Sequence, residues 1–170
     1  MEIRRPLRKS VEPKLRRNVR NLAVAATAGL ALRIAEQPVA VPLSALVARR
    51  RWGLLQIVKL PLWIEVAAAV LLLDYTLYWW HVATHRVPWL WRFHAVHHVD
   101  LDLDASTAIR FHFGELTHSV AWRATQIVLI GVTPLSLSIW QAALIPAVLF
   151  HHSNVWLSEA TERRLARFIV

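Results

Sequence analysis

Five of the chain's nine histidines lie in one eighteen-residue stretch, HVATHRVPWLWRFHAVHH. His81 and His85 are four residues apart, and His94, His97 and His98 follow with spacings of three and one. Residues three or four apart share a face of a helix, so each group can aim two imidazoles at one point. Imidazole is a neutral nitrogen ligand that suits iron, zinc, copper and nickel.

These histidines have a second interpretation, as ordinary hydrogen-bonded residues of a protein core. A lone histidine on an apolar face is more often such a residue, and a pair at helical spacing also arises by chance. Two groups this close together, in a chain without cysteine, favour a metal site. Without thiolates, the metal must be held by nitrogen and oxygen ligands.

The composition indicates a membrane protein of one domain. Hydrophobic residues make up 56% of the 170 residues, and several of the nine Trp sit near the ends of apolar runs, as at membrane interfaces. The formal charge is +9, but eight of the 20 Lys and Arg fall within residues 1–20. No zinc-finger spacing or RNA-binding motif accompanies this charge, so nucleic acid is not expected as a partner.

The basic N-terminal end predicts the orientation of the chain. A basic segment followed by apolar runs is typical of a cytoplasmic flank. We expect residues 1–20 to be a mobile basic cytoplasmic tail that touches anionic headgroups. A second basic cluster, residues 49–51, is expected on the same side of the membrane.

The apolar runs predict helices that enter or cross the membrane. Residues 21–37 are Ala-rich and are expected to be helical up to the prolines at positions 38 and 42. Residues 54–85 form the main apolar helix, which Pro88 breaks before the second histidine group begins a new helical turn. Residues 124–150 carry no charge, and Gly131 near their start favours a helical hairpin.

Carboxylates lie on both sides of the histidine stretch. Asp74 is two helical turns before His81, on roughly the same face, and a carboxylate in an apolar helix marks a functional site by default. We expect it to bind a metal or orient a histidine; the alternative is an ion pair elsewhere. Asp100, Asp102 and Asp104 lack the Gly and Glu of a calcium loop and are expected to be solvated.

Histidines recur beyond this stretch. His112 lies three residues before Glu115, with His118 close behind, so a helix would bring these side chains together. His151 and His152 end the uncharged segment, at the same boundary layer as the earlier histidines. Histidines at the ends of several apolar helices predict one shared site.

From about residue 73 to residue 170 the chain resembles the fatty acid hydroxylase and sterol desaturase superfamily. The resemblance rests on LDYTLYWWHVATH, on the box WRFHAVHH, and on the segments STAIRFHFGE and FHHSN. It implies an all-α fold of integral-membrane helical hairpins, with histidine clusters at the cytoplasmic helix ends. The branch resembles bacterial proteins, which implies the inner membrane, with the N-terminus and the histidines cytoplasmic.

The resemblance also implies a centre of two non-haem iron ions, which zinc can replace in purified protein. The matching metal ligands are His81, His85, His94, His97, His98, His112 and His152. Further candidates for coordination, or for holding a ligand in place, are Asp74, Glu115, His151 and Asn154. No catalytic residue beyond the metal ligands is expected.

The sequence departs from the family pattern at two places. Phe113 stands where the family usually has Pro. After a segment such as RRLARFIV the family continues into a third box, HxxHH, which does not follow here. The membrane-embedded domain, residues 21–170, is therefore expected to be C-terminally incomplete.

The expected function is that of a membrane-bound iron oxygenase that hydroxylates or desaturates a lipid C–H bond with O2. The substrate is expected to be a fatty acyl chain, a sterol or a related lipid. Cleaving such a bond needs a redox cofactor, and the electrons must come from a partner protein or reductase. The alternatives are a non-catalytic membrane metal-binding protein, and a transporter or bis-histidine haem protein.

Overall fold

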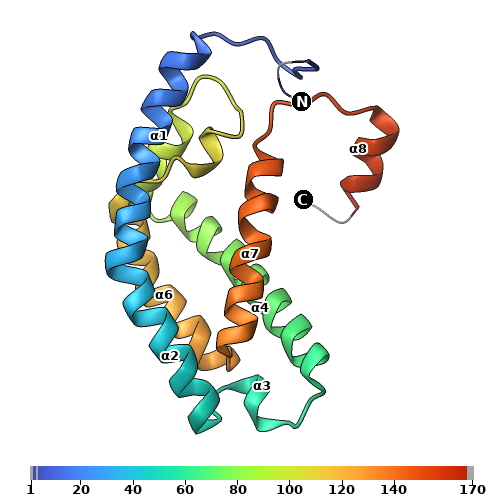
Figure 1. The fold of residues 1–170 in the computed structure, drawn as a ribbon. Coiled ribbons are helices and arrows are strands. Elements are labelled where there is room, and N and C mark those ends of the chain that lie inside the picture. The colour runs from blue at the N-terminus through green and yellow to red at the C-terminus, as the bar shows by residue number, and fades with distance from the viewer. Residues whose placement is uncertain (1, 3, 168–170) are drawn as a thin grey trace.

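The computed structural model describes residue 2 and residues 4–167, and every regular element in this part of the chain is a helix (Figure 1). Three helical stretches are long and apolar enough to cross a membrane: Lys14–Ile57, Leu62–Arg86 and Pro134–His151. The expected all-α fold with membrane-spanning helices is therefore confirmed. The last three residues of the C-terminal segment lie outside the described residues.

The first helical rod does not end at the prolines. Helix α1 (Lys14–Ala31) passes through a π-helical turn, η1 (Leu32–Glu36), directly into α2 (Gln37–Arg50). A proline ring normally clashes with the carbonyl four residues earlier, and the wider π turn just before Pro38 relieves that crowding. The prediction that Pro38 limits this helix was wrong.

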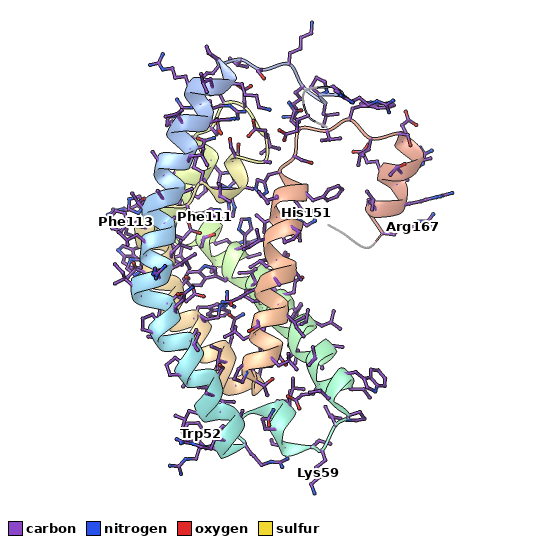
Figure 2. The ribbon with its side chains drawn as sticks, viewed as in Figure 1. Trp52, Lys59, Phe111, Phe113, His151 and Arg167 are labelled. Carbon is purple, nitrogen blue, oxygen red and sulfur yellow. The ribbon has the colours of Figure 1, made fainter. Side chains whose placement is uncertain are left out.

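The continuous rod also separates the two basic segments. At 1.5 Å per residue, α1, η1 and α2 together extend about 55 Å. Residues 49–51 therefore lie at the end of the molecule opposite to the N-terminal basic residues, contrary to the prediction (Figure 1). Figure 2 shows Trp52 and Lys59 at this far end, and Phe111 and His151 at the other.

The prediction of one helix over residues 54–85 was wrong at its start, because the chain is extended at Val58 and a new helix begins after Pro61. A short helix, α3 (Leu54–Ile57), is separated by Pro61 from α4 (Leu62–Arg86), which is followed by α5 (Pro88–His98). Val87 is extended, as expected of a residue before proline, so α4 stops and α5 starts in a new direction. The break at Pro88 and the new helical turn are confirmed.

The remaining elements complete the bundle. A 3₁₀ turn, η2 (Thr107–Ile109), precedes α6 (Phe113–Ile130) and α7 (Pro134–His151), and α8 (Glu159–Leu165) follows. Gly131 ends α6 with a φ of 86°, and the Thr133 side chain caps α7. The predicted helical hairpin is confirmed.

The helices pack around a small apolar core. Helix α2 lies against α6, and α4 lies against α7. Val47, Leu73, Ile127 and Val132 are fully buried in this core. Many other large apolar side chains face outward, as expected where lipid rather than water surrounds a helix. The C-terminal ends of α4 and α7 lie at the same end of the bundle (Figure 1).

A buried polar layer joins the helices farther down the bundle. The Arg123 Nε lies 3.6 Å from the Glu36 Oε1, and the guanidinium sits 4.1 Å from the centre of the Trp140 ring. Gln126 accepts a hydrogen bond from Arg123 and donates to the Leu73 carbonyl. Each charged group is paired, which offsets the cost of burying it.

The aspartate loop is not solvated as predicted. Asp102 and Asp104 are buried, and both contact the guanidinium of Arg17, which is 1% exposed. Asp100 lies 3.3 Å from the same guanidinium. Lys14 lies 3.9 Å from Asp104 and Arg20 lies 3.8 Å from Asp100. Three cations of the basic N-terminal segment thus offset the charges of the three aspartates, so burial becomes tolerable.

The residues before α1 are also fixed to the rest of the chain. The backbone N–H groups of Val11 and Glu12 donate to the Asp102 carboxylate at 2.8 and 3.0 Å. The Arg8 N–H donates to the Asn154 Oδ1 at 2.8 Å. The structure thus shows an anchored segment where the sequence predicts a mobile one.

Substitution of Gly53 tests the close contact between the start of α3 and the turn that joins α6 to α7. Its φ is 90°, and an added Cβ would lie 2.3 Å from the Gly131 backbone nitrogen. We expect Gly53→Ala to destabilise the fold by about 1–3 kcal/mol, because both the φ and the backbone contact are strained. Gly29→Ala is the matched control, since nothing lies within 4 Å of its Cβ. Thermal melting in detergent should separate the two variants, and equal melting temperatures would contradict the prediction.

The environment of the Asp102 carboxylate predicts that the stability of the folded chain depends on pH. Burial alone raises its pKa, but the N–H groups of Glu12 and Val11 and the charge of Arg17 outweigh this and hold the pKa below its ordinary value. A lowered folded-state pKa gives stability that is present above about pH 4 and is lost as pH falls through the folded-state pKa.

We therefore expect the wild type to melt higher than Asp102→Asn at neutral pH. The gap between the two melting temperatures should shrink as pH falls below about 4, because the wild-type carboxylate becomes protonated. A gap that stays constant from pH 6 to pH 2.5 would contradict this role of the charge.

Candidate metal centre

The first histidine group lies on the last two turns of α4. His81 and His85 share a face of the helix, and their Nε2 atoms are 3.2 Å apart. Two nitrogens this close can both reach one ion, because metal–nitrogen bonds to histidine are about 2.1 Å long. Both rings are exposed on one side, so the pair is accessible.

The second group, on α5, meets the first. The Nε2 atoms of His94 and His98 are 3.1 Å apart, and the His94 ring lies 4.9 Å from that of His81 and 4.8 Å from that of His85. One donor nitrogen from each of His81, His85 and His94 lies within 4.8 Å of the others. The turn at Val87 brings the two groups together, because it folds α5 back across the end of α4.

A third pair joins α5 to the end of α7. His97 and His152 face one another with their Nε2 atoms 2.9 Å apart, and the Phe111 ring stacks on His97 at 5.2 Å. Burial, and then the neighbouring histidines, lowers the pKa of His97 to about 3. His97 is therefore neutral at physiological pH, as a metal ligand must be.

Hydrogen bonds fix the rings of two of these histidines. The His94 Nδ1 lies 2.9 Å from the Glu115 Oε1, and the His152 Nδ1 lies 2.8 Å from the Val148 carbonyl. An acceptor at Nδ1 favours the tautomer that carries its proton there. The Nε2 lone pair of each ring then points toward the other histidines, as in metal sites where a carboxylate or carbonyl orients the ligand.

The other predicted site residues lie around this cluster. His112 caps α6 through its Nδ1 and packs on Phe93, while His118 contacts Trp89 and Phe93. Among the described residues, no hydrogen bond or ring contact joins either ring to the paired histidines. His112 and Glu115, expected to meet on one helix, instead point to different partners, because α6 begins only at Phe113.

Three more candidates make no hydrogen bond or ring contact with the paired histidines within the described part of the chain. Asp74 is exposed on α4 and makes no hydrogen bond or ion pair within the described part of the chain. His151 is exposed and contacts Phe150. The Asn154 side chain hydrogen-bonds the backbone of Arg8, and the Asn154 backbone N–H donates to the Glu2 carboxylate. Asn154 therefore fixes the N-terminal segment.

The donor set fits a metal ion of borderline softness. The cluster offers imidazole nitrogens and one neighbouring carboxylate, a combination that suits iron or zinc. The Glu115 Oε2 and the His97 Nδ1 are buried without a hydrogen-bond partner among the described residues. Such atoms cost about 1–3 kcal/mol each if nothing binds them, which favours a polar or metal occupant.

The pairing of Glu115 with His94 could not be read from the sequence. The spacing linked Glu115 to His112, whereas the fold brings it to a histidine on α5, 21 residues earlier. The available signal was weak: Glu115 is the one carboxylate in the apolar segment that starts α6.

Helices long and apolar enough to cross a membrane, with a histidine cluster at one end, indicate a narrow class of membrane proteins. Sequence comparison identifies the family within that class. The fatty acid hydroxylase family matches residues 66–169. The chain belongs to this family, within the fatty acid hydroxylase and sterol desaturase superfamily that its motifs predict.

Three curated relatives are similar to part of the chain. A cholesterol 25-hydroxylase-like protein from Danio rerio is 34% identical over 95 residues, which are 55% of this chain and 34% of that protein. The cholesterol 25-hydroxylase of Homo sapiens is 32% identical over 95 residues, 55% of this chain and 31% of that protein. The ornithine lipid hydroxylase OlsE of Rhizobium tropici is 31% identical over 96 residues, 56% of this chain and 29% of that protein.

The matched region thus spans about a third of the length of these relatives. No solved structure matches the chain significantly. By their names, these relatives are hydroxylases of cholesterol or of an ornithine lipid.

Glu115 should control metal affinity without being a ligand itself. We expect Glu115→Ala to weaken Co²⁺ or Zn²⁺ binding by about 10–100-fold, because the His94 ring loses the acceptor that orients it. Thr117→Ala, at an exposed position on the same helix, is the control. Metal titration of both purified variants checks this, and equal affinities would contradict it.

Proposed function

We propose that the chain is a membrane-bound non-haem iron oxygenase that hydroxylates or desaturates a lipid C–H bond with O2. Two iron ions would be held by the paired histidines of α4, α5 and α7. The substrate is a fatty acyl, sterol or related lipid, as the names of the relatives suggest. A reductase or electron-transfer protein supplies the electrons.

One observation carries this proposal. Three pairs of histidines, from three separate helices, turn their Nε2 atoms toward one another at 2.9–3.2 Å. Core histidines satisfied by ordinary hydrogen bonds have no need to gather in this way. The convergence occurs where the apolar helices end, so a lipid chain lying in the bilayer can reach it.

The residues have distinct roles in this proposal. His81, His85, His94 and His98 form the larger donor group, and His97 with His152 forms a second. Glu115 and the Val148 carbonyl hold two rings in the binding tautomer. Phe111 covers His97 and excludes water from that side.

Bound iron would supply the redox chemistry that no side chain has, namely reduction of O2 for cleavage of a strong C–H bond. In hydroxylation one oxygen atom enters the C–H bond and the other leaves as water. Two electrons and two protons from the donor system balance this step. The protein contributes binding, orientation and the exclusion of water.

The charge distribution supports a cytoplasmic histidine end. Most of the 20 Lys and Arg residues lie at that end, including those of residues 4–20 and 163–167. Residues 49–51 and Lys59 are at the other end. The positive-inside rule therefore favours the orientation in which an electron donor from the cytoplasm meets the histidines, as at a bacterial inner membrane.

The test measures metal, oxygen and lipid together. The full chain, in nanodiscs of mixed lipids, is loaded with Fe²⁺ and given a reductant and ¹⁸O2. The proposal expects about two iron ions per chain and ¹⁸O in a lipid alcohol, or loss of two hydrogens for desaturation. His94→Ala, with its central ligand removed, should lose both iron and product, whereas Thr117→Ala should keep both.

The outcomes separate the alternatives. A chain that binds metal but neither consumes O2 nor modifies lipid is the non-catalytic metal-binding protein. Failure to bind any metal overturns the proposal entirely.

A further inference from the structure

We propose that Arg17, on the N-terminal helix α1, is a positioning residue for the histidine centre. The inference rests on the proposed function, because it assumes that the histidines hold metal. Arg17 acts through the loop that follows His98 and does not itself touch the histidines.

The first step is the ion cluster around Arg17. Its guanidinium contacts the carboxylates of Asp100, Asp102 and Asp104, and it donates a 2.8 Å hydrogen bond to the Asp102 carbonyl. The Arg17 side chain is 1% exposed, so solvent does not screen these contacts. Lys14 and Arg20 are more exposed and each approach one aspartate, at 3.9 and 3.8 Å, whereas the buried Arg17 contacts all three.

The second step connects this cluster to the end of α5. Asp100 comes two residues after His98 and also accepts hydrogen bonds from Asn21 and Thr107, both at 2.8 Å. Asn21, one helical turn after Arg17 on α1, in turn accepts a 2.8 Å hydrogen bond from the Arg110 Nη1. Helix α1 therefore holds both ends of the loop between α5 and α6.

The third step reaches the histidines. The Arg110 Nε donates to the Val96 carbonyl at 2.7 Å, within the last turn of α5. The last four carbonyls of a helix have no partner within the helix, so their ends fray unless another group binds them. A cation at this position is favourable for the helix dipole as well. This turn carries His97 and His98, and fraying there would move both rings.

Arg17 and Asn21 lie outside the family match, which begins at residue 66. Their partners Asp100, Thr107 and Arg110 lie inside it. The N-terminal helix is therefore a part of the site that the family comparison does not cover. Removing Arg17 leaves Lys14 at 3.9 Å from Asp104 and Arg20 at 3.8 Å from Asp100, but it takes away the buried cation between the three carboxylates. Their mutual repulsion then loosens the loop.

The test uses the full chain in detergent micelles, loaded with Co²⁺ as a spectroscopic substitute for iron. Arg17→Met removes the charge while keeping an unbranched apolar chain, and Arg17→Lys restores a charge without the planar fork. Arg16→Met, at an exposed neighbouring position, is the matched control. Each variant is measured for its Co²⁺ absorption bands, its rate of Co²⁺ release to a chelator, and its melting temperature without metal.

We expect Arg17→Met to release Co²⁺ about 10–100-fold faster than Arg16→Met and to shift the absorption bands. Arg17→Lys should recover only part of the difference. If Arg17→Met does not fold, Asn21→Ala keeps the Arg17 ion pairs but removes the hydrogen bonds of Asn21 with Arg110, Asp100 and Ser106. We then expect an intermediate rise in the release rate.

The contrary result is a lower melting temperature with unchanged bands and release rate, since a merely structural residue gives that pattern. This result overturns the inference and leaves the metal centre intact. A wild-type chain that binds no Co²⁺ overturns the proposed function and the inference together.

Discussion

In three histidine pairs, the Nε2 atoms of the two rings face one another at 2.9–3.2 Å. The rest of the structure depends on this constraint. Two such nitrogens can bind one ion only if their rings are held in fixed positions, because each metal–nitrogen bond is about 2.1 Å long. Burial keeps His97 neutral, and acceptors at Nδ1 set the tautomers of His94 and His152. The last turns of α4, α5 and α7 must therefore lie close together, and each helix must keep a fixed rotation about its own axis.

The apolar helices provide this common level. The buried core is small, and many large apolar side chains lie on the outer surface, which suits a bundle surrounded by lipid. Within the bundle, a polar layer around Arg123 and Glu36 connects η1, α4, α6 and α7. Such contacts are directional, so they fix helix rotation in a way that apolar packing alone does not.

The histidine end depends on charged side chains for its order. Arg17 gathers three aspartates, Arg110 binds the last turn of α5, and Asn21 joins the two arginine sites through hydrogen bonds. Polar tethers are effective here because, among the described residues, the buried apolar core contains none from α5 or from residues 99–112. The basic N-terminal residues thus contribute to the structure of the histidine end.

The sequence by itself determined the all-helical architecture, the break at Pro88, the hairpin at Gly131 and the grouping of histidines by helix. These follow from local spacing and backbone chemistry. Family membership also followed from the motifs. Only the tertiary structure decided that the rod continues past Pro38, that Glu115 binds His94, and that Arg17 binds the aspartate loop. These depend on residues up to 87 positions apart, and local periodicity does not encode which distant side chain will neutralise a buried charge.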